Sequence, residues 1–486
     1  MALANSSRAA AVSIDTRYKN YNLGAVYFLQ QRIAVLAQGA DATSYSLEKF
    51  EATTHQQVGD KLGFGSPAHL SARELLPDNG DGALGATVTI YPLENMQSAL
   101  AADGAITPVG KQLKNAQYVV MAGGIKSNPF TAFKDEEPAA IIPKIVTAIN
   151  GVLNMPIIAY DDTTSVKISA KTKGELGNDL KIKLFGIEQG IVFTVTKMAG
   201  GLVNPSVITA LDQVGGTWET IIVNTLGESA HDHLQIFGEG RWGQLVHKPL
   251  FALSGTSEED PNVLIAYADT RKDDRINGVI PCPGSLSANY LIAARAVARI
   301  AKQANQNPAA EYRGMRLDTI ENGKDGEQWN YLQRDSAYKS GVSSTQLQDS
   351  TITLDNTLLF YHPDNNVNPE FIKVIYLIKL QNIIYNINLI FNTDEWKQAA
   401  LIPDHEVSSN IAARKPSDAV AALFTLTDNL ANNALIADRK FTKDNITAKI
   451  DPSNPNRVNT SFPVKLTGNW DIHSIDLLFG FYLGAS

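Results

Sequence analysis

The chain has 486 residues, 44% of them apolar, and a formal net charge of −8 from 42 basic and 50 acidic residues. This length exceeds what one hydrophobic core usually supports, so we expect roughly two to four domains. The acidic balance disfavours a protein that binds nucleic acid along its length, and the single cysteine, Cys282, excludes a disulfide within the chain.

Residues 1–22 are interpreted as an N-terminal linking arm. They contain no continuous apolar stretch of the kind that a secretory signal requires. Their second half alternates apolar and polar side chains, as a β-strand with one buried face does. The residues of the apolar face are Val12, Ile14, Thr16 and Tyr18. We expect another copy of the chain to supply the partner strand.

Strands that alternate with helices predict an α/β body in two parts, residues 23–159 and residues 236–365. In the first part we expect strands at 25–37, 83–93 and 118–122 and helices at 46–62 and 138–153. In the second part we expect a helix at 290–305, turns from 322 to 349 and a strand at 351–361. Three basic side chains of that helix are expected to face solvent, namely Arg295, Arg299 and Lys302.

Residues 160–235 differ from the flanking sequence in their pattern of apolar and polar residues, and this pattern predicts a β-rich insertion. Short alternating runs begin at Ser165 and continue to Val223, and glycines separate them. Regular strands with glycine turns are typical of a small antiparallel sheet or sandwich.

Residues 366–469 predict a C-terminal domain with amphipathic helices at 369–401 and 417–433 and strand-like stretches at 440–450 and 464–468. The apolar stretch 374–391 carries Lys379 and several amides, which argues against membrane insertion.

Residues 470–486 are interpreted as a C-terminal linking arm, again a strand without a partner in its own chain. Its apolar residues are Ile472, Ile475, Leu477, Phe479, Phe481 and Leu483. The expected fold is therefore an α+β or α/β multidomain protein with β-arms at both ends and a β-rich inserted domain.

Three patterns could carry chemistry, and each has a simpler interpretation. The run 123–127, GGIKS, lacks the spacing of a phosphate loop, so an ordinary strand-exit turn is favoured. His231-Asp232-His233 has no third metal ligand at a useful spacing, so a solvated polar turn is favoured. The acidic clusters are interpreted as solvated faces; they are Asp161-Asp162, Glu258-Glu259-Asp260 and Asp273-Asp274. We expect no enzymatic activity, no cofactor and no metal.

Residues 439–465 contain six basic and two acidic residues. A solvated strand face explains this excess, and a basic strip that meets an acidic surface on a neighbouring copy or another protein is the alternative. The basic residues are Arg439, Lys440, Lys443, Lys449, Arg457 and Lys465.

Several stretches resemble the contractile tail sheath proteins of myophages, in particular the Mu-like branch. Residues 169–182, SAKTKGELGNDLKI, are similar to the signature of that family's β-rich inserted domain. Residues 260–284, followed by the helix at 290–305, resemble its central α/β part. Residues 449–459, KIDPSNPNRVN, resemble the terminus of Mu-like sheath proteins. The identifying residues of the signature are Gly174, Gly177, Asn178 and Asp179.

The resemblance implies a structural subunit with an inner α/β domain, an outer inserted domain and arms that add strands to a small sheet in neighbouring subunits. Such subunits form stacked hexameric rings around a tail tube, and their contraction drives the tube through the host envelope for genome delivery. The implied partners are other copies, the tail tube protein, and the baseplate and tail terminator proteins. The implied location is the virion tail, after assembly in the host cytoplasm. A tube-facing helix is expected within residues 369–435.

Two other functions remain open on the sequence. One is another helical or baseplate component of a phage tail or contractile injection system. The other is a hydrolase with an unrecognised site.

Overall fold

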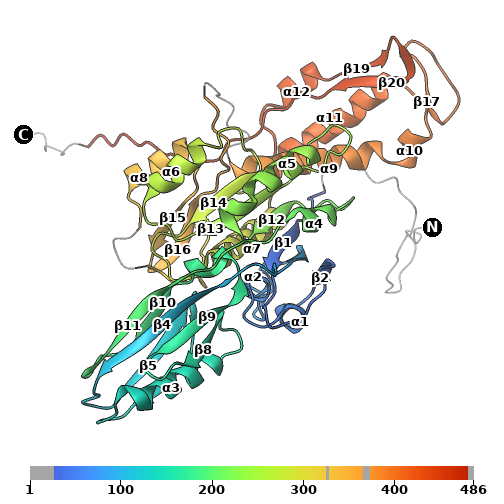
Figure 1. Cartoon of the computed structure of the whole chain (residues 1–486). Coiled ribbons are helices and arrows are strands. Elements are labelled where there is room, and N and C mark those ends of the chain that lie inside the picture. The colour runs from blue at the N-terminus through green and yellow to red at the C-terminus, as the bar shows by residue number, and fades with distance from the viewer. Residues whose placement is uncertain (1–26, 324–327, 365–372, 480–486) are drawn as a thin grey trace, which may run out of the picture. The chain divides into compact units, whose positions relative to one another are not determined.

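The computed structural model describes residues 27–323, 328–364 and 373–479 (Figure 1). The chain divides into two compact units. Unit 1 contains Asn382–Gly468, and unit 2 contains Phe28–Gln381 and the segment that begins at Asn469. The expected mixed α/β multidomain class is confirmed. The N-terminal arm lies outside the described residues, and so do Phe481 and Leu483.

Unit 2 is built on a six-stranded sheet whose spatial order is β14-β13-β12-β1-β3-β2. The strands are parallel except for β2, which pairs antiparallel with β3 at one edge. Their bounds are β1 Arg32–Gln38, β2 Phe50–Ala52, β3 Thr87–Leu93, β12 Ile221–Asn224, β13 Phe251–Thr256 and β14 Asn277–Pro281.

Both faces of this sheet are buried, because successive side chains of a strand point to opposite faces. Ile33 and Val35 of β1 enter one core, and Ala34 and Leu36 enter the other. One core also receives α2 and α7, and the other receives α4 and α5. The helices of this part are α1 His55–Leu62, α2 Pro67–Leu75, α4 Ile208–Asp212, α5 His231–Arg241, α6 Pro261–Asp269 and α7 Asn289–Gln306.

Two predicted local structures in this part were wrong. The helix expected at 46–62 begins only at His55, because the Thr54 hydroxyl caps it by accepting from the Gln57 N–H at 3.3 Å. Within the expected helix, Phe50–Ala52 form the edge strand β2. The turns expected from 322 to 349 include helix α8, Tyr331–Lys339, which begins with a capping box at Asn330. The strands β15 Ser344–Gln348 and β16 Thr351–Asn356 form a hairpin after it.

The β-rich region of unit 2 contains two antiparallel sheets, with strand orders β11-β4-β9-β8 and β10-β5-β6, and β7 pairs with β5 (Figure 1). Helix α3 packs against strands of both sheets. The bounds are β4 Ala101–Gly110, β5 Ala116–Ala122, β6 Ile125–Lys126, β7 Phe130–Ala132, α3 Pro138–Asn150, β8 Ile157–Asp161, β9 Val166–Lys173, β10 Ile182–Phe185 and β11 Ile191–Ala199.

The boundaries of this region differ from the expected insertion at 160–235. Strands β4 and β5 pair with β11 and β10, so the region begins before residue 160. Strand β12, which lies inside the expected range, belongs to the parallel sheet. Strand alternation is a local property, and the pairing of strands distant in sequence determines to which sheet each strand belongs.

Unit 1 contains helices around a short hairpin. Helix α11 packs on α12 and on β19. The stretch 440–450, expected to be strand-like, is part helix and part strand, because Asp438 caps α12 by accepting from the Phe441 N–H at 2.9 Å. The stretch 464–468 makes a single bridge, between Ile436 and Leu466. The bounds are α10 Asp394–Lys397, β17 Ala400–Leu401, β18 Ala413–Arg414, α11 Pro416–Asn432, α12 Arg439–Asn445, β19 Thr447–Asp451 and β20 Asn454–Ser461.

Helix α9, Val374–Phe391, is by length and composition the one described helix that could cross a membrane. Of its apolar window, 56% is buried within the protein. Its polar residues Lys379 and Gln381 are buried too, and the Gln381 side chain donates to the carbonyls of Thr220 and Pro249, both at 3.1 Å. These are the contacts of a core helix in a folded protein.

The basic residues of α7 are mostly buried, so the prediction that they face solvent was wrong. Arg295 and Arg299 are 2% and 8% exposed. Arg299 donates to Asp81 at 2.5 Å and to Asp318 at 2.7 Å, and Arg295 donates to Asp81 at 3.1 Å. Hydrogen bonds from Arg299 hold the pKa of Asp81 below its usual range. The cluster therefore fixes the loop that carries Asp81 onto α7.

We predict that Asp81→Asn lowers the free energy of unfolding by about 2 kcal/mol, because it leaves two buried guanidinium groups short of a carboxylate. Urea denaturation at neutral pH measures the change. Asp60→Asn, on the exposed face of α1, is the matched control and should change stability by less than about 0.5 kcal/mol. Equal stability of the two variants would contradict a role for the cluster in holding this loop.

Candidate functional site in the C-terminal segment

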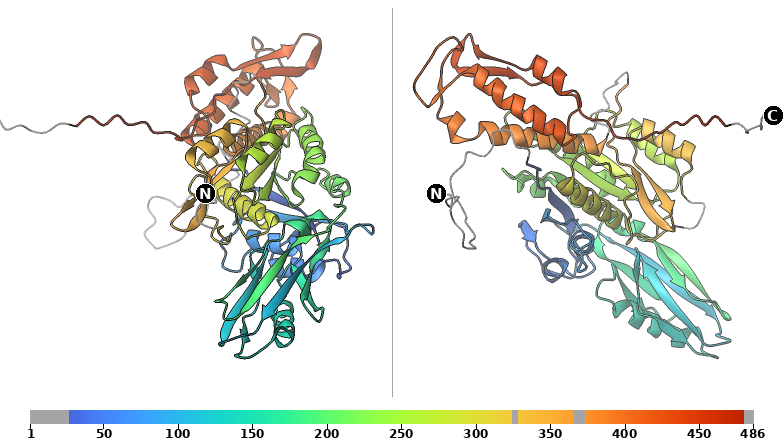
Figure 2. Two further views of the ribbon diagram at one scale, coloured as in Figure 1. Left: turned by 60° about the vertical axis from the view of Figure 1, so that its left-hand side comes forward. Right: turned by 180° about the vertical axis from the view of Figure 1, so that it is seen from behind.

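The C-terminal segment, residues 469–479, exposes its apolar side chains. It belongs to no strand or helix and extends away from the rest of unit 2 (Figure 2). Six large apolar side chains in it are 71% to 87% exposed: Trp470, Ile472, Ile475, Leu477, Leu478 and Phe479. Burial of one such side chain contributes about 1.5–3 kcal/mol. The segment therefore gains free energy when another surface covers these side chains.

The order of residues 475–479 favours a β-strand with one wholly apolar face. Ile475, Leu477 and Phe479 occupy alternate positions, Ser474 precedes them, and Asp476 lies between Ile475 and Leu477. Alternate side chains of a strand share a face. The exposed Trp470 and Leu478 were not among the predicted arm residues. In an extended strand they would share a face with Ile472, opposite Ile475, Leu477 and Phe479.

Unit 1 contains an exposed two-stranded sheet, the hairpin of β19 and β20. The strands pair antiparallel, with Lys449 opposite Asn459 and Ile450 opposite Val458. Most residues of β20 are exposed. A two-stranded sheet of this kind offers outer edges to which a further strand can pair. The stretch that resembles the terminus of Mu-like sheath proteins forms this hairpin.

Most charges of the predicted basic strip have partners within unit 1. Lys440 pairs with Asp444 at 2.5 Å, and Arg457 lies 3.8 Å from Asp451. The other ion pairs use two aspartates outside 439–465 or at its edge: Arg439–Asp428 at 3.7 Å, Lys443–Asp428 at 2.6 Å and Lys465–Asp438 at 2.7 Å. A count of charges along the sequence missed these partners. Contact of the strip with an acidic partner stays a prediction.

The signature residues of the β-rich region have structural roles. Gly174 has φ +100, and a Cβ at Gly177 would lie 2.9 Å from the Cβ atoms of Ala102 and Ala170. The Asn178 amide exchanges two hydrogen bonds with the backbone of Gly201, at 2.8 and 3.0 Å. Asp179 accepts from the Asn289 amide at 3.1 Å, which joins the region to the start of α7. The signature thus specifies a tight turn and its attachment to the parallel sheet.

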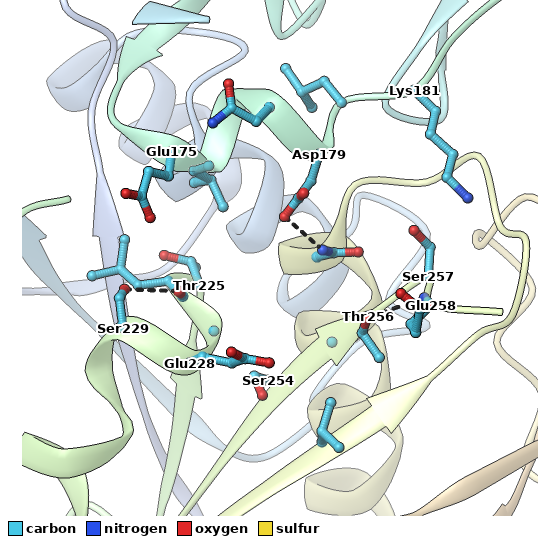
Figure 3. A pocket seen from close by; sticks show the side chains of 18 of the residues that line it. Glu175, Asp179, Lys181, Thr225, Glu228, Ser229, Ser254, Thr256, Ser257 and Glu258 are labelled. Atoms are coloured by element: carbon cyan, nitrogen blue, oxygen red, sulfur yellow. Dashed lines mark hydrogen bonds between the residues drawn. The ribbon is translucent and has the colours of Figure 1, made fainter. Parts of the chain in front are cut away.

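A cleft of about 900 Å³ lies beside this turn, at the carboxyl ends of β12 and β13 (Figure 3). Its acidic side chains include Glu175, Asp179, Glu228 and Glu258. Burial raises the pKa of Asp179 and of Glu228. In the parts of the chain that the structure describes, no group of three or more His, Cys, Asp or Glu residues is arranged to hold a metal ion.

The interpretation of His231-Asp232-His233 as a solvated turn was wrong. These residues begin helix α5, and His231 is buried while His233 is exposed, so the two rings do not share a face. The Nδ1 atom of His231 lies 2.7 Å from the Tyr267 hydroxyl, and its Nε2 lies 3.4 Å from the Ser254 hydroxyl. His231 therefore joins α5 to α6 and β13.

Two other patterns also have structural explanations. The glycines of GGIKS form the turn between β5 and β6, and Ser127 Oγ accepts from the Val120 N–H at 3.0 Å. Asp274 is buried rather than solvated, and its carboxylate accepts from the N–H groups of Ile276 and Asn277 at 2.9 and 3.0 Å. Cys282 is buried, and burial raises the pKa of its thiol to about 12, so it packs as an apolar side chain.

The described residues thus combine a folded multidomain body with an exposed apolar segment and an exposed hairpin. The chain is similar to the Mu-like prophage FluMu tail sheath protein of Haemophilus influenzae, with 20% identity over 404 residues that cover 80% of this chain and 81% of that protein. The expected resemblance to Mu-like tail sheath proteins is confirmed by this relative. No protein-family model matches the chain.

Two solved structures of sheath tail proteins match most of the chain. That from Desulfitobacterium hafniense has 12% identity and a TM-score of 0.48, and the match covers 94% of this chain and 100% of that one. That from Listeria innocua has 13% identity and a TM-score of 0.49, and the match covers 92% of this chain and 94% of that one.

We predict that His231→Gln reduces the loss of stability in acid. Burial lowers the pKa of His231 to about 3, from an ordinary 6.5. Between pH 6.5 and 3, His231 is therefore protonated in the unfolded chain and neutral in the folded chain. The free energy of unfolding falls as the pH drops through this range. Between pH 7.5 and 5 the variant should lose about 2 kcal/mol less than the natural protein.

Urea denaturation at the two pH values measures this difference. His233→Gln, at an exposed position of the same helix, is the control and should keep the pH dependence of the natural protein. If His231→Gln kept it as well, His231 would not be buried and neutral.

Proposed function

We propose that this protein is a structural subunit of a contractile tail sheath. The observation that carries the proposal is the exposed apolar segment 472–479, in a chain that is similar over most of its length to a tail sheath protein. Subunits that join through unlike surfaces propagate into a helix instead of closing into a dimer. A segment on unit 2 that binds an unlike site on the next copy is a contact of that kind.

The hairpin of β19 and β20 is the proposed acceptor of the segment. It is more exposed than the hairpin of β15 and β16, several strand residues of which are buried. Addition of a strand to its edge would pair backbone groups along residues 472–479 and cover one row of their apolar side chains. We propose the same mode for Val12, Ile14, Thr16 and Tyr18 of the N-terminal arm.

The assembly that follows has stacked hexameric rings around a tail tube, with the baseplate and tail terminator at its ends. Its place is the virion tail, and its assembly takes place in the host cytoplasm. Contraction would move the subunits as rigid bodies, while paired arms keep neighbours joined. The helices of unit 1 within 369–435 are proposed to face the tube, and the basic strip to meet an acidic neighbour. The role is structural and needs no catalysis.

We predict that Leu477→Glu abolishes the formation of long particles, because it places a charge on the apolar face of the added strand. Ser474→Glu is the matched control: it adds the same charge to the same segment on the opposite face and should leave assembly intact. Removal of residues 471–486 should have the effect of Leu477→Glu. Sedimentation velocity and electron microscopy of the purified proteins measure particle size.

Long, regular particles from the truncated protein would overturn the role of the C-terminal arm. Equal inhibition by the two glutamate variants would show that charge in the segment matters and that strand pairing does not.

A further inference from the structure

The first residues of the C-terminal segment are bound to unit 2 by polar contacts. The Asp471 carboxylate pairs with the ammonium group of Lys373, and the Asp471 carbonyl accepts from Arg313 at 2.6 Å. Two residues earlier, the Asn469 side-chain oxygen accepts from Lys379 at 3.1 Å, and its amide donates to the Ala309 carbonyl at 3.3 Å. The segment is therefore attached at its start and exposed along the rest of its described length.

The lysines that bind the segment are buried and belong to α9 and the residue before it. Lys373 and Lys379 are 3% and 0% exposed. Lys373 also lies 3.6 Å from Glu311, so it joins that carboxylate to Asp471. Burial lowers the pKa of Lys379 to about 8. Removal of an oxygen ligand from a buried ammonium group costs free energy. Asn469 and Asp471 are therefore held in the positions where their oxygen atoms reach the two lysines.

The side chains that attach the segment to unit 2 are polar, and the large apolar side chains of the segment take no part in the attachment. The side chains of Asn469 and Asp471 both contact unit 2, whereas Trp470, which lies between them, is 80% exposed. The attachment uses directional hydrogen bonds and buries none of the large apolar side chains of the segment. Those side chains stay available to another surface.

We propose that Lys373, Lys379 and Arg313 form a fixed joint that binds Asn469 and Asp471 and passes force from the C-terminal arm to unit 2. The part about force rests on the proposed sheath function. The joint itself is a property of the single subunit. It sets the point and direction from which the arm leaves the body, so that a pull on the arm moves the parallel sheet and α9 with it.

Limited proteolysis of the full-length, unassembled protein tests the joint. Chymotrypsin cleaves after Trp470, inside the joint, and after Phe479, beyond it. Each rate is divided by that of a synthetic peptide with the same sequence, which removes effects of sequence on cleavage. In the natural protein the bond after Trp470 should be protected relative to the bond after Phe479. Asp471→Asn should reduce that protection roughly tenfold, because it removes a charge-assisted hydrogen bond.

Matched variants separate the joint from general effects. Asp476→Asn makes the same change five residues farther along, in the exposed part of the segment, and should leave protection unchanged. Lys373→Met removes the partner on the body and should act as Asp471→Asn does, whereas the exposed Lys339→Met should not. Thermal unfolding shows whether each variant keeps its fold, and Asp471→Asn tests the joint even where Lys373→Met fails to fold.

Unchanged protection in a folded Asp471→Asn variant would overturn the joint. Particles formed by Asp471→Asn should also dissociate roughly tenfold faster on dilution than those of Asp476→Asn. Lost protection with particles of normal stability would overturn the transfer of force. A natural protein with a protected joint that never assembles would overturn the sheath function and leave the joint in place.

Discussion

Burial of the apolar side chains of residues 472–479 is the interaction on which the proposed assembly depends. In the single chain these side chains face water, although each contributes about 1.5–3 kcal/mol when it is buried. Part of that gain is offset by the ordering of an extended segment and the loss of free motion on association. Strand addition buries these side chains in one defined arrangement. Backbone hydrogen bonds fix the register of the added strand, and alternate side chains enter the interface.

The rest of unit 2 is a rigid body to which the start of the segment is attached. A parallel sheet with both faces buried resists deformation, since side chains of one strand enter two separate cores. The cluster of Asp81 with Arg295 and Arg299 fixes a long loop on α7, and the contacts of Asn469 and Asp471 fix the segment on α9. Buried charges are costly in general, but such contacts define one geometry where apolar packing would tolerate several.

Local patterns of the sequence identified many elements, and long-range pairing explains most of the errors. The strands β1, β3 and β5 and the helices α3, α7 and α11 follow from hydrophobic periodicity, which depends on near neighbours. Arg295 and Arg299 have the charge of surface residues, but both are buried and both bind Asp81, which is distant in the sequence. The same limit applies to β12, whose sheet is determined by distant strands. The exposure of residues 472–479 was expected because their alternation has no partner in the nearby sequence.

Strand addition between copies can be seen by cryo-electron microscopy of particles formed by the full-length protein. We expect helical tubes or stacked rings in which residues 472–479 of one copy extend the β19–β20 hairpin of another. Particles in which this segment folds onto its own subunit, or a protein that stays a single subunit at all concentrations, would contradict it.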